Sequence, residues 1–276
     1  MTDAIKSMQL YPRAERILDD LAALGYSDDS ALSVAEVNQF DQLHYHGTDA
    51  IDAAITACGI QAGDRVLEVG AGWGGCARYL AQATGAHVTA VELQADYHHI
   101  GTDLTLRTRL SHVVNHVHAD FLSLDLPSAR FDHVVSWLAL FHIPDRASYL
   151  ARIHRALAPE GKLFAEDLFA LSPVSLDEQA DFSAHLFPNS LVDWDSYQSG
   201  LVEAGFGSVS LQDMTDDWTR FTAERLSQFR AQKAAYLAVH GEQGYALIEQ
   251  FYDKMAGYLA RGLVGGVQLV AEKPAL

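Results

Sequence analysis

Cysteine and long apolar runs are both scarce in this 276-residue chain. Cys58 and Cys76 are its only cysteines, too few for a disulfide framework. No stretch approaches the roughly 18 to 20 consecutive apolar residues that a membrane-spanning helix needs. The N-terminus, MTDAIKSMQLYPRAER, lacks the apolar core of a secretory signal. We therefore expect a cytoplasmic protein without integral membrane association.

Basic residues are scarce as well. The chain contains 19 Lys and Arg residues, of which five are Lys, against 36 Asp and Glu residues, and its formal net charge is −17. Proteins that bind nucleic acid draw much of their affinity from Lys and Arg on the phosphates. The composition thus disfavours a nucleic-acid partner and leaves a small-molecule substrate. The acidic balance fits either an ordinary solvated exterior or a surface adapted to salt.

The first 60 residues predict a helical N-terminal extension. In PRAERILDDLAALG, the residues Ile17, Leu18 and Leu21 have helical spacing, and Gly25 provides a stop. Residues 48–58, TDAIDAAITAC, predict a second helix that is capped by Thr48.

From residue 61 to about 170, strand and helix patterns alternate. The strand candidates are RVLEVG, HVTAVE, VVNHVH, FDHVVSW and GKLFAED. Short apolar, β-branched runs separated by helices predict a doubly wound, Rossmann-like α/β core with a mostly parallel sheet that is covered on both faces.

After residue 170 the alternation breaks. Two helices are expected near 175–186 and 193–204, followed by the strand FGSVSLQDM, long helices and the strand GGVQLVAEKP. The last two strands bring the sheet to seven, with the final strand antiparallel. Residues 171–276 should therefore complete the sheet of the same domain and place a helical lid over its carboxyl edge.

The glycine loop LEVGAGWGG, residues 67–75, follows the first strand and opens a helix. Such a loop brings backbone amides and a helix N-terminus close to a ligand. As G-x-G-x-x-G it matches the dinucleotide fingerprint through Gly70, Gly72 and Gly75, with the acid Glu92 about 20 residues on. The loop alone is therefore ambiguous between two classes of cofactor.

Acids around the loop favour a cofactor that carries an amino acid. Glu68, just before the glycines, suits an ammonium group and would repel a pyrophosphate. Asp120 follows the third strand beside Phe121, and this pair offers an acceptor and an apolar face to an adenine. The terminal strand pair adds an antiparallel hairpin at the end of the sheet.

These features resemble the class I S-adenosylmethionine-dependent methyltransferases, strongly over residues 48–167. The resemblance implies that Glu68 and the glycine loop hold the methionine part, that Glu92 accepts the ribose hydroxyls, and that Asp120 with Phe121 frames the adenine. The implied cofactor-binding set is Glu68, Gly70, Ala71, Gly72, Gly74, Glu92, Leu93, Asp120, Phe121 and Trp137. The implied cofactor is S-adenosyl-L-methionine.

The segment FDHVVSWLALFHIPD places His142 at the carboxyl edge of the fourth strand, where a doubly wound sheet has its substrate crevice. It resembles small-molecule N-methyltransferases of the phosphoethanolamine and sarcosine/dimethylglycine type. The resemblance implies a catalytic pair of His142 and Tyr45, with His142 as base or positioning group. The implied substrate-binding set is Tyr45, His46, Phe141, His142, Asp167 and Trp218.

One position departs from this pattern. The amine enzymes carry an aspartate four residues before the histidine, and here Leu138 stands there. Asp167 at the end of the fifth strand is a candidate replacement, although a solvated strand-end acid fits that position equally well.

Two other functions remain open. Cyclopropane and mycolic-type lipid C-methyltransferases share GWGG and a histidine near position 142, but they have a glutamate where this chain has Phe141. A scaffold that binds the cofactor and has lost catalysis is the second alternative. In HVVNHVH, strand alternation turns His116 and His118 to one face without a third ligand, so no metal site is expected.

Overall fold

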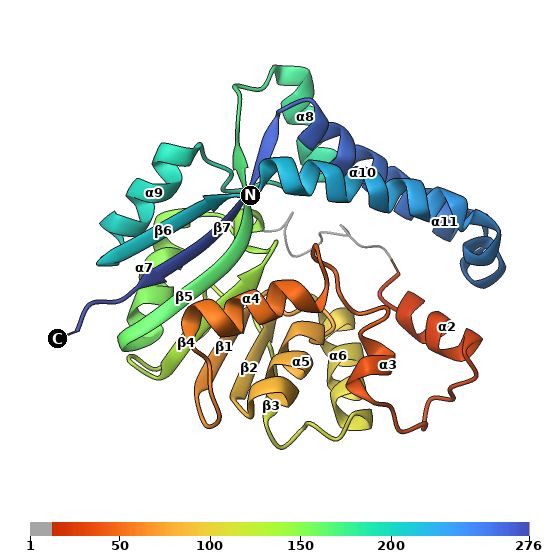
Figure 1. Cartoon of the computed structure of the whole chain (residues 1–276), viewed down its shortest axis with the longest axis horizontal. Coiled ribbons are helices and arrows are strands. Elements are labelled where there is room, and N and C mark those ends of the chain that lie inside the picture. The colour runs from red at the N-terminus through yellow and green to blue at the C-terminus, as the bar shows by residue number, and fades with distance from the viewer. Residues whose placement is uncertain (1–12, 276) are drawn as a thin grey trace.

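A single seven-stranded sheet organises residues 13–275, which are the residues that the computed structural model describes (Figure 1). The spatial order of the strands is β3-β2-β1-β4-β5-β7-β6. Their bounds are β1 Arg65–Val69, β2 His87–Glu92, β3 Val114–His118, β4 Phe131–Trp137, β5 Leu157–Ala170, β6 Ser208–Asp213 and β7 Val264–Glu272. Strands β1 to β5 pair in parallel, and β7 is antiparallel to both β5 and β6. The predicted fold class is therefore confirmed.

Helices cover both faces of the sheet, which explains why the central strands are continuously apolar. One face packs on α4 (Thr48–Cys58) and α5 (Gly75–Thr84) through residues such as Ile51 and Leu80. The other face packs on α7 (Arg146–Ala156) and α9 (Trp194–Glu203) through residues such as Ile153 and Leu201. Helix α6 (Ala95–Arg107) lies against β2 and β3.

The N-terminal extension contains α2 (Arg16–Ala23) and α3 (Val34–Val37) ahead of α4. The helix predicted in PRAERILDDLAALG is α2, and Pro12 of that segment lies outside the described residues. The prediction that Thr48 caps the next helix is wrong. Helix α4 already includes Thr48, and its N-cap is Gly47, whose φ of 54° only a residue without a side chain adopts easily. No side chain caps this helix.

Four helices follow β5: α8 (Leu176–His185), α9, α10 (Thr215–Ala231) and α11 (Lys233–Ala260), the last interrupted by non-helical dihedrals at Gly241. Figure 1 shows α10 and α11 lying side by side beyond one end of the sheet. Their aromatic side chains pack with the end of β5 and the start of β7, which is the carboxyl edge of the parallel strands. Among residues 13–275, no helix is long and apolar enough to cross a membrane.

Two histidine–aspartate pairs join the N-terminal extension to these helices. His46 Nε2 lies 2.6 Å from Asp217 Oδ2 on α10, and His240 Nε2 on α11 lies 2.6 Å from Asp20 Oδ1 on α2. The guanidinium of Arg225 adds a third tie, because it stacks 4.9 Å from the centre of the Tyr45 ring. The N-terminal extension is therefore packed against α10 and α11 at the carboxyl edge of the sheet.

The contact between α10 and β7 gives a direct test of this packing. A Cβ added to Gly266 would lie 2.2 Å from Cε3 of Trp218, so Gly266→Ala should lower the free energy of unfolding by about 1–3 kcal/mol, the usual cost of overfilling a core. Gly257→Ala on α11 is the matched control, because no atom lies within 4 Å of its added Cβ. It should keep or slightly raise stability. Urea denaturation measures both, and an unchanged Gly266→Ala would contradict the packing.

Candidate active site

An open cleft lies where β1 and β4 diverge, the point at which the strand order of the sheet reverses. Doubly wound sheets bind their ligands at this switch point. The cleft has about 1110 Å³ of space between protein atoms, part of it continuous with solvent. Its walls come from the loops after β1, β2, β3 and β4, and from Leu43 of the N-terminal extension. Of the predicted site residues, the cleft wall contains Gly70, Gly72, Glu92, Leu93, Asp120, Phe121, Trp137 and His142.

The glycine loop faces the cleft with its first two glycines. Gly70 and Gly72 have φ angles of 78° and 54°, in the left-handed region that favours glycine. A Cβ on Gly70 would lie 2.3 Å from the Cβ of Ala139, just after β4. The backbone at Gly70 therefore lies so close to Ala139 that no side chain fits between them. The predicted residues Ala71 and Gly74 do not lie on the cleft wall.

Glu92 at the end of β2 holds the glycine loop through hydrogen bonds. Its Oε2 accepts a hydrogen bond of 2.8 Å from the amide of Gly72, and its Oε1 accepts one of 2.7 Å from the amide of Gln94. Burial raises the pKa of Glu92, and these backbone donors act against that shift. A carboxylate has about four acceptor sites, so these backbone donors leave room for a further donor. Glu92 can thus hold the loop and accept hydroxyl groups from a ligand at the same time.

The loop after β3 supplies an apolar surface beside a carboxylate. The Phe121 ring is buried, and the Arg152 guanidinium lies 6.0 Å from its centre. Arg152 Nε also donates to the Phe121 carbonyl at 3.0 Å. Asp120 Oδ1 accepts from the amide of Leu122 at 2.9 Å, which orients the carboxylate. This wall offers an aromatic ring an apolar face and an acceptor.

Glu68 lies behind the glycine loop rather than on the cleft wall. Its side chain is buried, and among residues 13–275 its Oε2 has no hydrogen-bond partner. Burial raises the pKa of Glu68 to about 8, although the Arg78 guanidinium pulls it down. The carboxyl group is therefore largely protonated at neutral pH.

His142 reaches the cleft from the 3-10 turn η1 (Leu140–His142) after β4. Its Nδ1 lies 3.0 Å from the carbonyl of Phe187, which can only accept, so Nδ1 carries the proton of the neutral ring. Burial lowers the pKa of His142 to about 4. At neutral pH the imidazole is uncharged, and its Nε2 carries a lone pair that has no hydrogen bond to residues 13–275.

The wall beside His142 is apolar. Leu138, at the position of the missing aspartate, has a φ of 52° and donates its amide to the carbonyl of Glu166 at 2.7 Å. The indole of Trp137 packs 5.8 Å from the His44 ring and 6.0 Å from the Phe164 ring. No carboxylate side chain lies on this part of the wall within the described chain.

Asp167 is fully buried, so the interpretation of a solvated strand-end acid is wrong. Its Oδ1 accepts from the amide of Phe141 at 3.2 Å, and its Oδ2 accepts from the hydroxyl of Tyr197 at 2.8 Å. Burial raises the pKa of Asp167 to about 6, while Arg146 and these hydrogen bonds oppose the shift. Asp167 thus holds the turn that carries His142 and does not line the cleft.

The other predicted substrate residues form an aromatic cluster beside the cleft. Tyr45 meets Trp218 edge to face at 4.8 Å, and the His46 ring lies 4.3 Å from Phe221. Phe141 belongs to the same cluster as Tyr45 and Trp218. Burial raises the pKa of Tyr45 to about 12. Tyr45, His46, Phe141, Asp167 and Trp218 are therefore neighbours of the cleft, and His142 is the predicted substrate residue on its wall.

Two functional candidates had no clear signal in the sequence. Leu43 forms part of the cleft wall from the segment between α3 and α4, which is not helical. Glu166 is buried beside Trp137 in the sheet register, accepts from Gln268 Nε2 at 3.0 Å, and has a pKa raised by burial to about 7. Strand alternation could have separated Glu166 from Asp167, because consecutive side chains face opposite sides of a sheet.

The histidines of HVVNHVH serve the fold around β3. Thr105 Oγ1 lies 2.8 Å from His116 Nε2, and His118 Nε2 donates to the carbonyl of Leu93 at 3.0 Å. Within residues 13–275, no three His, Cys, Asp or Glu side chains are arranged to hold a metal ion.

The strand order with its antiparallel β7, and the glycine-loop cleft at the switch point, define the architecture of a class I methyltransferase. Residues 67–165 match the family model described as "Methyltransferase domain". The chain therefore contains a methyltransferase domain of the S-adenosylmethionine-dependent class. The predicted cofactor and enzyme class are confirmed.

Relatives with assigned functions share this domain. The chain is 28% identical over 257 residues to 27-O-demethylrifamycin SV methyltransferase of Amycolatopsis mediterranei, covering 91% of this chain and 89% of that protein. It is 26% identical over 195 residues to glycine/sarcosine/dimethylglycine N-methyltransferase of Actinopolyspora halophila, covering 71% of this chain but only 31% of the relative.

A solved structure shares the fold. Phosphoethanolamine N-methyltransferase 2 of Haemonchus contortus, in complex with phosphomonomethylethanolamine and S-adenosylhomocysteine, superimposes with a TM-score of 0.79 at 22% identity. The match covers 85% of this chain and 54% of that one. At this level of identity the likeness shows the fold alone.

The cleft residues fit S-adenosylmethionine. Gly70 and Gly72 leave space for a ligand beside the loop backbone, and a Cβ at either position would collide with a neighbour or strain the backbone. Glu92 presents a carboxylate that can accept a further hydrogen bond. Asp120 and Phe121 offer an acceptor and an apolar face on the opposite wall. The cleft wall that residues 13–275 form contains no Lys or Arg beside Glu92.

Gly70→Ala tests this space beside the loop backbone. The added Cβ would overlap Ala139, so the loop must move, and the dissociation constant of S-adenosylhomocysteine should rise at least about tenfold, since a 1 Å misplacement has effects of that order. Gly59→Ala has the same backbone strain, with a φ of 72°, and no atom within 4 Å. This control should bind as the wild type does. Calorimetry measures both, and equal affinities for the two variants would remove Gly70 from the cofactor site.

Proposed function

We propose that this protein transfers a methyl group from S-adenosylmethionine to a nitrogen of a small molecule that enters the cleft uncharged. The observation that carries the proposal is the neutral His142, whose Nδ1 is fixed by Phe187 and whose Nε2 is left as an acceptor at the cleft. Gly70, Gly72, Glu92, Leu93, Asp120, Phe121 and Trp137 would hold the cofactor.

The cofactor supplies an electrophilic methyl group, so the protein has little covalent chemistry to perform. Its tasks are to orient the acceptor in line with that group and to exclude water. Trp137, Leu138 and Ile143 provide an apolar wall for this purpose. The Asp167 carboxylate, by accepting from the Phe141 amide, keeps the turn with His142 in place.

His142 is suited to orient an acceptor rather than to store its proton. With a pKa of about 4, the imidazole is a weak base, and a proton of an ordinary amine would not move to it at neutral pH. Its Nε2 can nevertheless accept a hydrogen bond from an N–H group and thereby direct the nitrogen lone pair. This favours the positioning role of His142 over that of a base.

The absence of a carboxylate beside His142 favours an acceptor that carries no positive charge. Leu138 stands where an acid would attract a cation, and Asp167 is occupied by Phe141 and Tyr197. A charged ammonium would lose its hydration without gaining a counter-charge. The site therefore favours an aromatic, weakly basic or otherwise neutral nitrogen. The names of two relatives that methylate nitrogen support nitrogen as the acceptor atom, but they do not indicate which amine is the substrate.

A hydroxyl acceptor is the second candidate. The relative that the chain spans almost completely is an enzyme whose name places its methyl group on oxygen, and the apolar wall beside His142 suits a neutral alcohol as well. Nε2 of His142 would then accept the hydroxyl proton during methyl transfer.

A substrate screen tests the proposal. The protein is incubated with methyl-labelled S-adenosylmethionine and sets of neutral amines, cationic amines, alcohols and unsaturated lipids, and mass spectrometry detects the gain of one methyl group. Turnover of neutral amines supports the proposal, and turnover of alcohols alone supports the second candidate. Labelled acyl chains would indicate a lipid C-methyltransferase. Cofactor binding with no transfer to any class would indicate a scaffold.

His142→Ala tests the positioning role. Loss of the acceptor nitrogen should lower kcat by about 100-fold, the scale of a misplaced proton-handling group. Because His142 is at the acceptor end, the affinity for S-adenosylhomocysteine should stay within about twofold. Methyl transfer and calorimetry measure the two effects. An unchanged kcat would exclude His142 from the reaction.

The pH profile tests the charge state of His142. Its pKa of about 4, against about 6.5 for a free imidazole, keeps the ring neutral from pH 5 upward. The histidine should therefore contribute no change in kcat between pH 5 and 8, and activity lost through its protonation should appear only as the pH falls toward 4. An acid limb near pH 6.5 that disappears in His142→Gln would show that the ring titrates normally in the working enzyme.

A further inference from the structure

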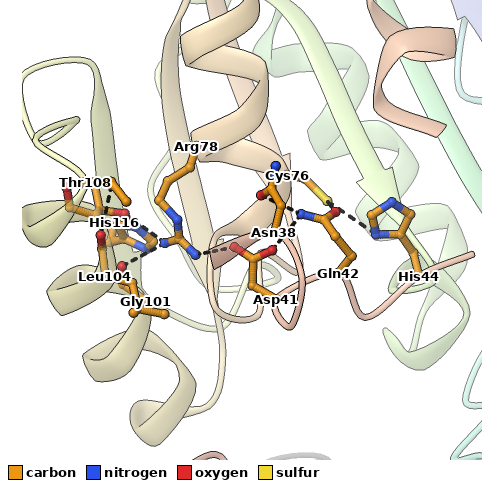
Figure 2. A network of polar contacts seen from close by, with 11 residues as sticks. Asn38, Asp41, Gln42, His44, Cys76, Arg78, Gly101, Leu104, Thr108 and His116 are labelled. Atoms are coloured by element: carbon orange, nitrogen blue, oxygen red, sulfur yellow. Dashed lines mark hydrogen bonds and ion pairs between the residues drawn. The ribbon is translucent and has the colours of Figure 1, made fainter. Parts of the chain in front are cut away.

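A buried ion pair lies on the far side of the glycine loop from the cleft. Arg78 of α5 donates from Nη2 to Asp41 Oδ2 at 2.8 Å, and both side chains are fully buried. Asp41 belongs to residues 38–47, which link α3 to α4 in the N-terminal extension, and Figure 2 shows it between Asn38 and Gln42 with its carboxylate toward Arg78. The pair is thus a contact between this extension and the cofactor-binding core.

Arg78 is itself held by a second set of partners. Its Nη1 donates to the carbonyl of Gly101 at 3.1 Å and to Thr105 Oγ1 at 3.0 Å, both on α6. Burial and the nearby guanidinium lower the pKa of His116 to about 3, so the ring is neutral, and its Nε2 lies 2.8 Å from Thr105 Oγ1. The chain of contacts fixes the guanidinium against α6 and β3, and it points at Asp41 (Figure 2).

The second pair of glycines in LEVGAGWGG makes room for these groups. A Cβ on Gly75 would lie 2.6 Å from Cγ of Asp41. A Cβ on Gly74 would lie 2.4 Å from Cε1 of His116 and 3.2 Å from Nη1 of Arg78. The loop therefore has two functions along its length: Gly70 and Gly72 face the cleft, and Gly74 and Gly75 receive the ion pair.

The residues that follow Asp41 connect the ion pair with the cleft wall. Gln42 Nε2 donates to Asp41 Oδ1 at 2.8 Å, and the Cys76 thiol lies 3.9 Å from Gln42 Oε1 and 3.5 Å from His44 Nδ1. His44 Nε2 donates to the Gly47 carbonyl at 2.8 Å, so its Nδ1 accepts from the thiol. Leu43, between these anchored residues, lies on the cleft wall, 3.1 Å from where a Cβ on Gly72 would be.

We propose that Asp41 and Arg78 are positioning residues for the cofactor: their ion pair holds residues 38–47 over the glycine loop and thereby places Leu43 as a wall of the cofactor cleft. Neither charged side chain lies on that wall. The inference rests on the cofactor cleft of the proposed function and is independent of the acceptor. The position of residues 38–47 and the binding of the cofactor are therefore linked. Breaking the ion pair weakens cofactor binding, and bound cofactor slows the hydrogen exchange of these residues.

Asp41→Asn removes the charge at nearly constant volume. The dissociation constant of S-adenosylhomocysteine, measured by calorimetry below the unfolding temperature of the variant, should rise at least tenfold. With saturating S-adenosylmethionine, kcat should stay within about threefold, so that the loss falls on KM for the cofactor. Hydrogen exchange of residues 38–47 should slow on ligand binding in the wild type and change less in the variant.

Asp132→Asn is the matched control. Asp132 pairs with Arg65 at 2.7 Å between β1 and β4, at the opposite end of these strands from the cleft. Its loss should leave the cofactor dissociation constant within twofold of the wild type. An Asp41→Asn variant that binds like this control would overturn the proposal. A wild-type protein that does not bind S-adenosylhomocysteine would instead refute the cofactor site itself.

The double variant Asp41→Leu, Arg78→Met separates positioning from stability. Replacing a buried ion pair by apolar residues often restores or raises stability, because no unpaired charge remains. If the directional contacts of the pair place the segment, cofactor affinity stays low although thermal stability recovers. Recovery of both together would show that the single variant acted only through its buried unpaired charge, and the positioning role would be wrong.

Discussion

The close approach of two backbones, at Gly70 after β1 and Ala139 after β4, is the constraint on which the cleft depends. An added Cβ on Gly70 would lie 2.3 Å from that of Ala139, so the two loops touch where the strands that carry them begin to diverge. Both loops line the cleft, together with the loops after β2 and β3 and Leu43 of the N-terminal extension. Glu92 then ties the glycine loop to β2 by accepting from the Gly72 amide. The shape of this part of the cleft thus depends on backbone contacts, and the Glu92 side chain contributes by holding the backbone of Gly72.

Four acids at the carboxyl ends of the strands show how environment assigns different tasks to one chemical group. Glu92 is held by backbone amides and faces the cleft. Glu68 lies behind the loop with a raised pKa of about 8. Glu166 and Asp167 are adjacent on β5 but bond to Gln268 on one side and to Phe141 and Tyr197 on the other. Of the four, Glu92 is the one on the cleft wall, and Glu166 and Asp167 hold neighbouring elements through their hydrogen bonds.

The sequence predicted the sheet well, because strand order in a doubly wound fold follows from local alternation of strands and helices. It also predicted that Glu92, Asp120 and His142 lie at one edge, since each follows a parallel strand. It could not place Tyr45 or Trp218, whose positions depend on packing between the N-terminal extension and α10, contacts between segments far apart in the chain. Nor could it separate the two pairs of glycines in the loop. The partner of the second pair, Asp41, comes from a segment between two predicted helices for which the sequence predicted no contact with the loop.

The neutral state of His142 and the charge of the acceptor that we propose have one physical cause. The pKa of His142 falls because the ring is buried and its one hydrogen bond, to a carbonyl, offsets only part of the cost of a charge. The same burial penalises any cationic acceptor that comes to rest beside it, since Leu138 offers no counter-charge. In the proposed function, desolvation at the end of β4 would therefore set both the protonation state of His142 and the charge of the acceptor that it orients. An acid placed at position 138 would change both together, because a carboxylate there would stabilise an imidazolium as well as an ammonium.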